Sequence, residues 1–538
     1  MMNYTLTLTE DNIIRIRFPY SPEAVEKVKS FSERSWNPEK TCWEIPLNLY
    51  YEIPEKLGIG IPQDIKEKYE YIYVKKPIKY SPLFLKPEIV PYDFQIAGIE
   101  FLASNKNVLL ADEVGLGKTL QAIIASLHLG CKKILVICPA SVKGQWKNEI
   151  LKFTTKNCVV IDGTPKQRQK QYSQDVTFYI LNYELIMKDL STLNTRVWDM
   201  IIADEISRIK NWKSKTKNAL IRIRTNFKIG ISATPIENNI QELHSIFTWI
   251  NPNILSSYWN FINEYCYFSS NMYGGYFITG IKDAKRLHET LKEGMIRRKK
   301  AEVYRELPAI IHNEYYIPLT STQQKMYEEI RNNILNLVQK EEFDDNVLNQ
   351  IMYLREICNS PRLLNPDLKE NGKVDEIVEI VKQFSSEHKI VIFSQWTKFL
   401  DLLGEEFNNN NIQFTSIRGD IPQEIRELNI QKFNTDPCLK ILLSSDAGNM
   451  GLNLQIADVL IHCDLLWNPQ KMIQREGRIH RIGQEKVANV ITIMTQDTIE
   501  EYVYSLLKNK SDLFNQIIEN ENSLKLTKDT IRKIFKNN

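Results

Sequence analysis

A lysine and a threonine follow a glycine-bearing stretch that could bind phosphate. An apolar run over 108–111 comes before the stretch and is typical of a buried parallel strand, and a helical pattern of apolar residues begins at Lys118. Gly115 and Gly117 favour an irregular backbone between the two. Strand, loop and helix in this order place backbone N–H groups around an anion. We therefore expect Lys118 to reach the outer phosphates of a nucleotide and the Thr119 hydroxyl to bind magnesium.

The loop departs from the generic phosphate-loop pattern at one position. Asp112 stands five residues before Gly117, where glycine is usual. A Gly-Lys-Thr triplet alone occurs by chance, so the strand before it and the helix after it are what favour nucleotide binding. We expect Asp112 and Val114 to belong to the same cradle. Upstream, the amide of Gln95 offers both a donor and an acceptor and could hydrogen-bond two edges of adenine.

Two adjacent carboxylates, Asp204 and Glu205, end an apolar run over 200–203. Similar runs at 134–139 and 178–181 alternate with helical segments, which predicts a parallel α/β sheet with its site at the strand ends. There, one carboxylate can hold magnesium, together with the threonine of the loop, and the other can orient the attacking water. The alternative is a pair of solvated charges.

A second α/β pattern begins near residue 372 and ends in a basic segment. Arg478 and Arg481 are three residues apart, so on a helix both would project from one face. Two guanidinium groups on one face can stabilise spread phosphate charge, as arginine fingers do. The alternative is an ordinary basic helix face.

Composition excludes several classes of protein. The 538 residues are 43% hydrophobic and 25% charged, as in globular proteins, and no apolar run is long enough for a membrane span. The formal net charge of +3 means that any nucleic-acid site is a local patch. Eight scattered cysteines without a C-x-x-C pair argue against zinc and for reduced thiols. No secretory signal is visible at the N-terminus, so we expect a cytoplasmic or DNA-associated protein without membrane contact.

The first 75 residues have a pattern of their own. A strand over 13–18, a helix over 22–31 and two short strands over 36–46, each with a tryptophan, are expected. This order, with its Trp-Asn-Pro turn returning to Trp-Glu-Ile-Pro, resembles the HARP module of annealing helicases, which implies binding to branched or forked DNA. The alternative is a generic small α+β domain with buried tryptophans.

Three stretches of eight to ten residues resemble the motifs of Swi/Snf-type ATPases of helicase superfamily 2. They are the loop at 112–119, the box Asp-Glu-Ile-Ser-Arg-Ile-Lys-Asn at 204–211 and the segment at 230–239. Ser207 replaces the usual histidine of the box, so we expect looser coupling between hydrolysis and the 230–239 segment. Asn449 replaces a glycine of a later loop, with little consequence because asparagine tolerates left-handed backbone.

This resemblance implies a fold of two RecA-like parallel-sheet lobes with helical insertions, in addition to the small N-terminal α+β domain. ATP and Mg²⁺ would bind between the lobes, with Gly451 also near the nucleotide. Residues 240–370 lose the strand pattern and are expected to be largely helical. The expected domains are an N-terminal domain (1–75), a linker (76–90), the first lobe (91–295), a helical insertion and inter-lobe linker (296–371), the second lobe (372–498) and a helix with a polar tail (499–538).

The resemblance also implies contacts with nucleic acid at ten positions. In the first lobe they are Ser141, Trp146, Asn182, Tyr183 and Lys215; in the second they are Gln395, Trp396, Ser444, Asn453 and Trp467.

The resulting hypothesis is an ATP-dependent double-stranded DNA translocase, a helicase-like, DNA-stimulated ATPase that remodels or anneals DNA, including forks. A monomer is expected, with a replication, repair or transcription protein as partner, associated with the nucleoid in a bacterium or phage and nuclear in a eukaryote. One alternative is an RNA-polymerase-recycling ATPase, which the Asp-Ala-Gly loop at 446–448 also resembles. Another is a non-catalytic DNA-binding protein.

Overall fold

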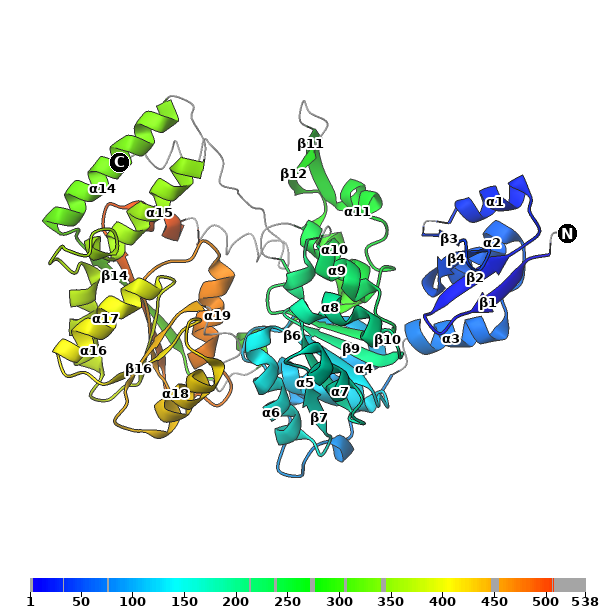
Figure 1. The fold of residues 1–538 in the computed structure, drawn as a ribbon, viewed down its shortest axis with the longest axis horizontal. Coiled ribbons are helices and arrows are strands. Elements are labelled where there is room, and N and C mark those ends of the chain that lie inside the picture. The colour runs from blue at the N-terminus through cyan, green and yellow to red at the C-terminus, as the bar shows by residue number, and fades with distance from the viewer. Residues whose placement is uncertain are drawn as a thin grey trace. The chain divides into compact units, whose positions relative to one another are not determined.

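The computed structural model of the chain divides into two compact units (Figure 1). Unit 1 comprises residues 1–113 and 117–299, and unit 2 comprises residues 114–116 and 300–538. The structure describes residues 3–31, 33–74, 77–211, 214–236, 240–270, 276–303, 307–339, 345–446, 454–505 and 507.

Unit 1 begins with a four-stranded antiparallel sheet in the order β1-β2-β4-β3. Its strands are β1 (Thr5–Leu8), β2 (Ile13–Arg17), β3 (Ser35–Asn37) and β4 (Cys42–Pro46), and its helices are α1 (Pro22–Lys29), α2 (Ile53–Leu57) and α3 (Gln63–Tyr73). Trp36 and Trp43 are paired across β3 and β4, with ring centroids 5.5 Å apart in an edge-to-face arrangement. The predicted strand, helix and two-stranded turn are confirmed.

A seven-stranded parallel sheet forms the first lobe, in the order β13-β5-β10-β9-β6-β8-β7. The strands are β5 (Asn107–Leu110), β6 (Ile134–Cys138), β7 (Cys158–Val160), β8 (Phe178–Asn182), β9 (Trp198–Asp204), β10 (Thr225–Ile231) and β13 (Met295–Ile296). The helices are α4 (Asp93–Asn105), α5 (Lys118–His128), α6 (Lys143–Phe153), α7 (Pro165–Tyr172), α8 (Tyr183–Leu193), α9 (Lys215–Ile221) and α10 (Gln241–Ile250).

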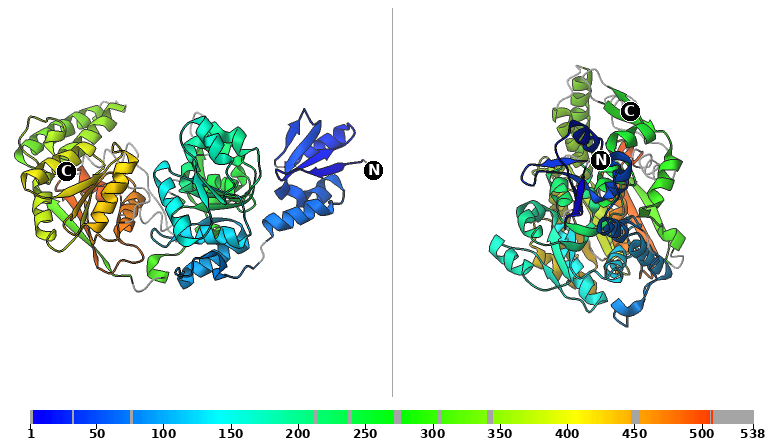
Figure 2. Two further views of the ribbon diagram at one scale, coloured as in Figure 1. Left: turned by 60° about the horizontal axis from the view of Figure 1, so that its bottom comes forward. Right: turned by 90° about the vertical axis from the view of Figure 1, so that its right-hand side faces the viewer.

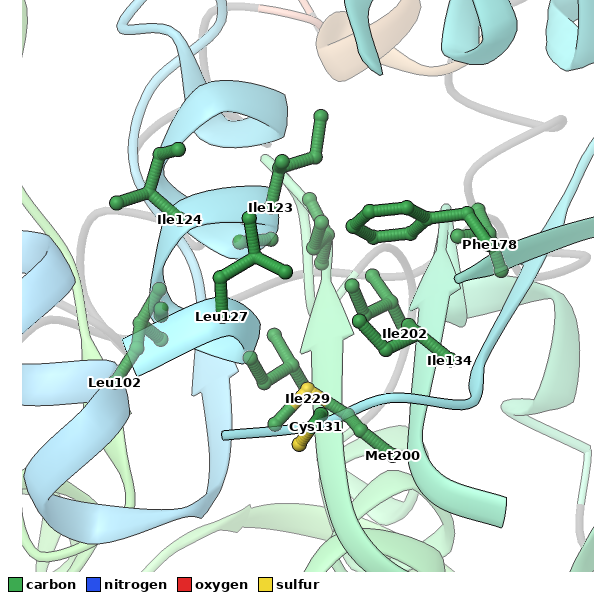
Figure 3. Close-up of a cluster of buried hydrophobic side chains, with 14 of the residues drawn as sticks. Leu102, Ile123, Ile124, Leu127, Cys131, Ile134, Phe178, Met200, Ile202 and Ile229 are labelled. Carbon is green, nitrogen blue, oxygen red and sulfur yellow. The ribbon is translucent and has the colours of Figure 1, made fainter. Parts of the chain in front are cut away.

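The core of this lobe lies between one face of the sheet and helices α4, α5 and α6. Ile134, Ile202 and Ile229 on the strands pack with Leu102 and Ile123 on the helices (Figure 3). The residues between them on the same strands are also buried, as expected for parallel strands covered on both faces. This explains why the strands read as continuous apolar runs in the sequence.

The expectation of a largely helical region over 240–370 is wrong in part. Helices α11 (Tyr258–Tyr265) and α12 (Ala284–Lys292) are present, but β11 (Cys266–Ser270) and β12 (Tyr276–Ile281) form a two-stranded antiparallel sheet between them. Strand β14 (Ile310–Ile317) follows further along, and six of its eight residues are exposed. Strands without a buried face lack the apolar periodicity that reveals a strand in a sequence.

Unit 2 contains a six-stranded parallel sheet in the order β14-β19-β18-β15-β17-β16. Its other strands are β15 (Ile390–Phe393), β16 (Phe414–Ile417), β17 (Ile441–Ser444), β18 (Val459–His462) and β19 (Ala488–Thr495). Its helices are α13 (Lys300–Val303), α14 (Ser321–Gln339), α15 (Asp345–Asn359), α16 (Lys373–Phe384), α17 (Thr397–Asn409), α18 (Gln423–Thr435) and α19 (Pro469–Ile479).

Helices cover both faces of this second sheet (Figure 2). Ile377 of α16 and Leu403 of α17 pack against Ile392 on one face. Phe433 of α18 and Ile479 of α19 pack with the residues of the opposite face. Two RecA-like parallel-sheet lobes and a small N-terminal α+β region are therefore confirmed. Within the part of the chain that the structure describes, no helix is both long and apolar enough to cross a membrane.

Candidate nucleotide-binding and hydrolysis site

The phosphate loop lies between β5 and α5, as the sequence predicts. Gly115 and Gly117 have φ angles of 90° and 71°, in the left-handed region that favours glycine. A Cβ atom on Gly117 would lie 2.4 Å from Nε2 of Gln95, so the loop backbone and the buried glutamine are in close contact. The Lys118 ammonium donates to the carbonyl oxygens of Asp112 at 2.8 Å and Glu113 at 3.0 Å, within the loop itself.

Asp112, the residue that stands where glycine is usual, is completely buried and forms an ion pair with Arg298. Arg298 Nε donates to Asp112 Oδ1 at 3.0 Å, and Gln121 Nε2 donates to Oδ2 at 3.1 Å. A buried carboxylate needs such partners because its transfer from water is otherwise costly. Asp112 is thus an anchor that ties the loop to the chain segment after β13.

Sequence reasoning missed this role of Arg298. Arg298 lies in the basic segment 297–300, and both arginines of this segment contact protein groups. Arg297 Nη1 donates to the carbonyl oxygens of Ala111 at 3.1 Å and Ala233 at 3.2 Å. The available signal was Asp112 itself, because a carboxylate that follows a buried strand and becomes buried needs hydrogen-bond donors, and a cation such as Arg298 is one way to supply them.

The paired carboxylates lie at the end of β9, at the same edge of the sheet as the loop. Leu110, Ile231 and Asp204 are in register across β5, β10 and β9, so the phosphate loop and Asp204 are two strand spacings apart, roughly 10 Å. Glu205 has a φ of 51°, a left-handed conformation that is uncommon for a residue with a side chain. Such strain is concentrated at functional sites.

Three donors hold Asp204 in place. Its Oδ1 accepts from the backbone N of Glu205 at 3.0 Å, its Oδ2 accepts from Trp146 Nε1 at 2.8 Å, and its carbonyl oxygen accepts from the Tyr183 hydroxyl at 2.8 Å. A carboxylate oxygen can accept more than one contact. That capacity fits Mg²⁺, which is usually bound by one or two carboxylates together with water and substrate phosphates.

Trp146, Tyr183 and Asn182, where the resemblance implies contacts with nucleic acid, have little exposed surface. Their exposed fractions are 2%, 3% and 8%, and their polar groups contact protein. Asn182 Nδ2 donates to Glu184 Oε2 at 2.6 Å. Lys215 is exposed at the start of α9 and Ser141 is half-buried, so these two positions are open to a ligand.

In unit 2, Arg478 lies in the last turn of α19, which ends at Ile479. Arg481 is therefore beyond the helix, and the prediction of two arginines on one helix face is wrong. The carbonyl oxygen of Arg478 accepts from the backbone N of Leu454 at 3.1 Å, and that of Ile479 accepts from Gln484 Nε2 at 3.1 Å. These contacts capture the carbonyl groups that would continue the helix.

A third arginine, Arg475, was not singled out by the sequence reasoning. It is 1% exposed, and its Nε donates to Asp446 Oδ1 at 2.7 Å. Its guanidinium carbon lies 5.3 Å from the centroid of the Phe393 ring. Arg475 is therefore a structural residue of the second lobe, because it joins α19 to Asp446 and to Phe393 on β15.

The residues of unit 2 that are expected to contact nucleic acid differ in how exposed they are. Ser444 is completely buried, which contradicts a contact through its side chain. Trp396 and Trp467 are half-buried, and the Trp467 ring centroid is 5.2 Å from the Arg355 guanidinium carbon. The backbone N of Gln395 donates to the buried Asp464 at 3.1 Å. Gly451 and Asn453, like Asn449, lie outside the described residues.

Two known domain families match the chain. Residues 92–363 match the SNF2-related domain, and residues 372–483 match the helicase conserved C-terminal domain. The first match alone covers half of the chain and includes both the phosphate loop and the paired carboxylates.

The chain is 31% identical over 502 residues to the ATP-dependent DNA helicase DDM1 of Arabidopsis thaliana, covering 84% of this chain and 65% of that protein. It is 30% identical over 456 residues to the chromodomain-helicase-DNA-binding protein 1-like of Mus musculus, covering 79% and 50%. The Sulfolobus solfataricus SWI2/SNF2 ATPase core in complex with double-stranded DNA is 28% identical, with a TM-score of 0.40, covering 85% and 99%. The chain thus spans less than two thirds of these two curated relatives. The chain belongs to the SNF2-related family, with a helicase C-terminal domain following its SNF2-related domain.

Proposed function

We propose that the protein is a DNA-stimulated ATPase that moves along double-stranded DNA and remodels DNA or protein–DNA complexes. The observation that carries the proposal is the register across β5, β10 and β9, which aligns a glycine phosphate loop with Asp204 and Glu205 at one sheet edge. Phosphoryl transfer from a nucleotide needs these parts on one rigid support.

Each site residue has a role in this proposal. Lys118 binds the outer phosphates, and Thr119 and Asp204 hold magnesium. Bound magnesium neutralises charge that develops on the phosphates. Glu205 orients the attacking water, and its strained backbone fixes the direction of the carboxylate. Arg478 and Arg481 supply positive charge to the transition state.

DNA is the proposed substrate because the names of both relatives, a DNA helicase and a helicase-DNA-binding protein, contain it. Family members of this kind act on the DNA backbone, so the reaction requires no base-specific contact. Fork remodelling, a DNA-repair role and a replication or transcription partner are finer proposals. Fork remodelling rests on the resemblance of the N-terminal sheet and its tryptophan pair to the HARP module, and a transcription partner rests on the resemblance of the sequence at 446–448 to the RNA-polymerase-recycling ATPase.

The test is the steady-state ATPase activity of the purified chain with Mg²⁺. The panel is no nucleic acid, single-stranded DNA, blunt duplex, forked duplex and double-stranded RNA. We expect duplex DNA to stimulate turnover, and forked duplex to stimulate it more. Lys118→Ala removes phosphate binding and Glu205→Gln removes the group that orients water, so each should lower turnover by at least about a hundredfold.

Lys188→Ala is the matched control, because this exposed lysine lies on α8 in the same lobe. It should hydrolyse ATP like the wild type. Near-wild-type turnover in Lys118→Ala or Glu205→Gln would disprove the site assignment. If the wild-type enzyme hydrolyses ATP at the same rate without nucleic acid and with every member of the panel, the proposal of a DNA-stimulated motor is disproved.

A further inference from the structure

Trp146 and Tyr183 both donate hydrogen bonds to Asp204 from separate helices. We propose that they are positioning residues, which hold the metal-binding carboxylate and connect it to the starts of α6 and α8, where the resemblance to Swi/Snf-type ATPases implies contacts with DNA. The proposed connection between Asp204 and DNA rests on the proposed function. The positioning of Asp204 is measurable without DNA.

The contact from α6 fixes the carboxylate itself. Trp146 is 2% exposed, and its ring packs in the core between the sheet and α5. Its Nε1 lies 2.8 Å from Asp204 Oδ2, while the backbone N of Glu205 occupies Oδ1. A donor on each oxygen determines the rotation of the carboxylate plane, and hydrogen bonds to an ionised acceptor are the stronger kind. Partners of this type behind a metal ligand control metal affinity.

The contact from α8 fixes the backbone of the same residue. Tyr183 is the first residue of α8, and its hydroxyl donates to the carbonyl oxygen of Asp204 at 2.8 Å. Tyr183 is 3% exposed, so protein surrounds this hydrogen bond. The guanidinium carbon of Arg208 lies 5.8 Å from the Tyr183 ring centroid, and Arg208 Nη1 donates to Glu184 Oε1 at 3.0 Å.

These contacts form a continuous path through unit 1. Lys143 at the start of α6 donates to Asn182 Oδ1 at 3.4 Å, and Asn182 donates to Glu184. Glu184 pairs with Arg208, which is in the same box as Asp204. The family usually has histidine at the position of the buried Ser207. The contacts described above connect Asp204 to the starts of α6 and α8 without using the side chain at position 207.

Phenylalanine replacements remove the donors. Tyr183→Phe keeps the ring, whereas Trp146→Phe replaces the indole with a smaller aromatic ring, so a matched Trp→Phe control is needed. In Trp146→Phe, Asp204 loses the hydrogen bond from Trp146 at Oδ2, and we expect the Mg²⁺ concentration for half-maximal binding of a fluorescent ATP analogue to rise about tenfold. The measurement is equilibrium fluorescence without turnover. In Trp146→Phe and in Tyr183→Phe, we expect the ratio of duplex-stimulated to basal ATPase to fall severalfold.

Two matched controls remove the same kind of buried donor elsewhere in the lobe. Trp198 Nε1 donates to the carbonyl oxygen of Leu193 at 3.0 Å, and the Tyr172 hydroxyl donates to Asp189 Oδ2 at 3.1 Å. Trp198→Phe and Tyr172→Phe should leave the Mg²⁺ dependence and the stimulation ratio unchanged. Equal effects in controls and test variants would mean general destabilisation and would overturn the inference.

The failure of the inference is distinguishable from failure of the proposed function. If duplex DNA stimulates the wild type, and Trp146→Phe retains both the wild-type ratio and Mg²⁺ dependence, only the positioning role is wrong. If no DNA stimulates the wild type, both the proposed function and the proposed connection between Asp204 and DNA are wrong. The Mg²⁺ titration of Trp146→Phe then decides the positioning of Asp204 alone.

Discussion

Asp112 and Arg298 form a buried ion pair whose members are far apart in the sequence. Arg298→Met leaves the Asp112 carboxylate, which has no exposed surface, without its cation. Loss of one partner of a buried pair typically costs about 3–5 kcal/mol of unfolding free energy. We therefore predict that thermal unfolding of the first lobe shifts downward by on the order of 10 °C, measured by differential scanning calorimetry.

The double variant Asp112→Asn/Arg298→Met is the control for this prediction. It removes the charge together with its partner, so it should unfold at a higher temperature than Arg298→Met. If both variants unfold at the wild-type temperature, Asp112 does not anchor the loop.

At the scale of elements, β14 and α19 are joined by a titratable contact. His312 Nε2 on β14 lies 3.2 Å from Glu476 Oε2 on α19, and this hydrogen bond raises the pKa of His312 above its ordinary value. The protonated ring therefore stabilises the folded state. This contribution is fully present below the ordinary pKa of about 6.5 and is lost as the pH rises through the raised folded value.

We predict that His312→Gln lowers the melting temperature more at about pH 6 than at about pH 8.5. The effect is on the order of 1–2 °C, because the His312 side chain is 53% exposed and solvent screens the pair. Scanning fluorimetry at the two pH values measures it. His288→Gln on α12 is the control, and a pH-independent difference for His312→Gln would contradict the prediction.

At the scale of the whole molecule, the N-terminal sheet is attached to the first lobe through the start of β10. Asn12 Nδ2 donates to the carbonyl oxygen of Thr225 at 3.2 Å, and Lys68 Nζ donates to Asn226 Oδ1 at 3.0 Å. The rings of Tyr71 and Phe227 are 5.2 Å apart. This is the edge of the sheet opposite the strand ends that carry the nucleotide site, so the N-terminal region can bind a ligand without entering that site.

We predict that deletion of residues 1–75 weakens the preference for forked over blunt duplex more than it lowers basal ATPase activity. The deletion also uncovers Phe227, so Trp36→Ala provides a second variant that leaves the attachment intact. Trp36 is 50% exposed on β3, where its ring is available to stack on an unpaired base. Unchanged fork preference in both variants, measured by ATPase stimulation, would remove the HARP-like interpretation.

Features that depend on neighbouring residues were predicted correctly from the amino-acid sequence. The run before Gly115 and the helical pattern after Lys118 predicted β5, the loop and α5, and apolar runs predicted β6, β8 and β9. The order of motifs predicted the two lobes. These predictions succeeded because a strand buried on both faces, or a helix with one apolar face, has a periodicity within a few residues.

Contacts between groups that are distant in the sequence could not be predicted and are seen only in the packed fold. The pairing of exposed β14 with β19, the anchor between Asp112 and Arg298, and the hydrogen bond from Trp146 to Asp204 each join segments that are dozens of residues or more apart. The end of α19 before Arg481 also depends on a distant residue, Leu454. Such contacts arise because buried charges and orphan carbonyl groups take whichever partner the packed fold brings near, and no local pattern specifies that partner.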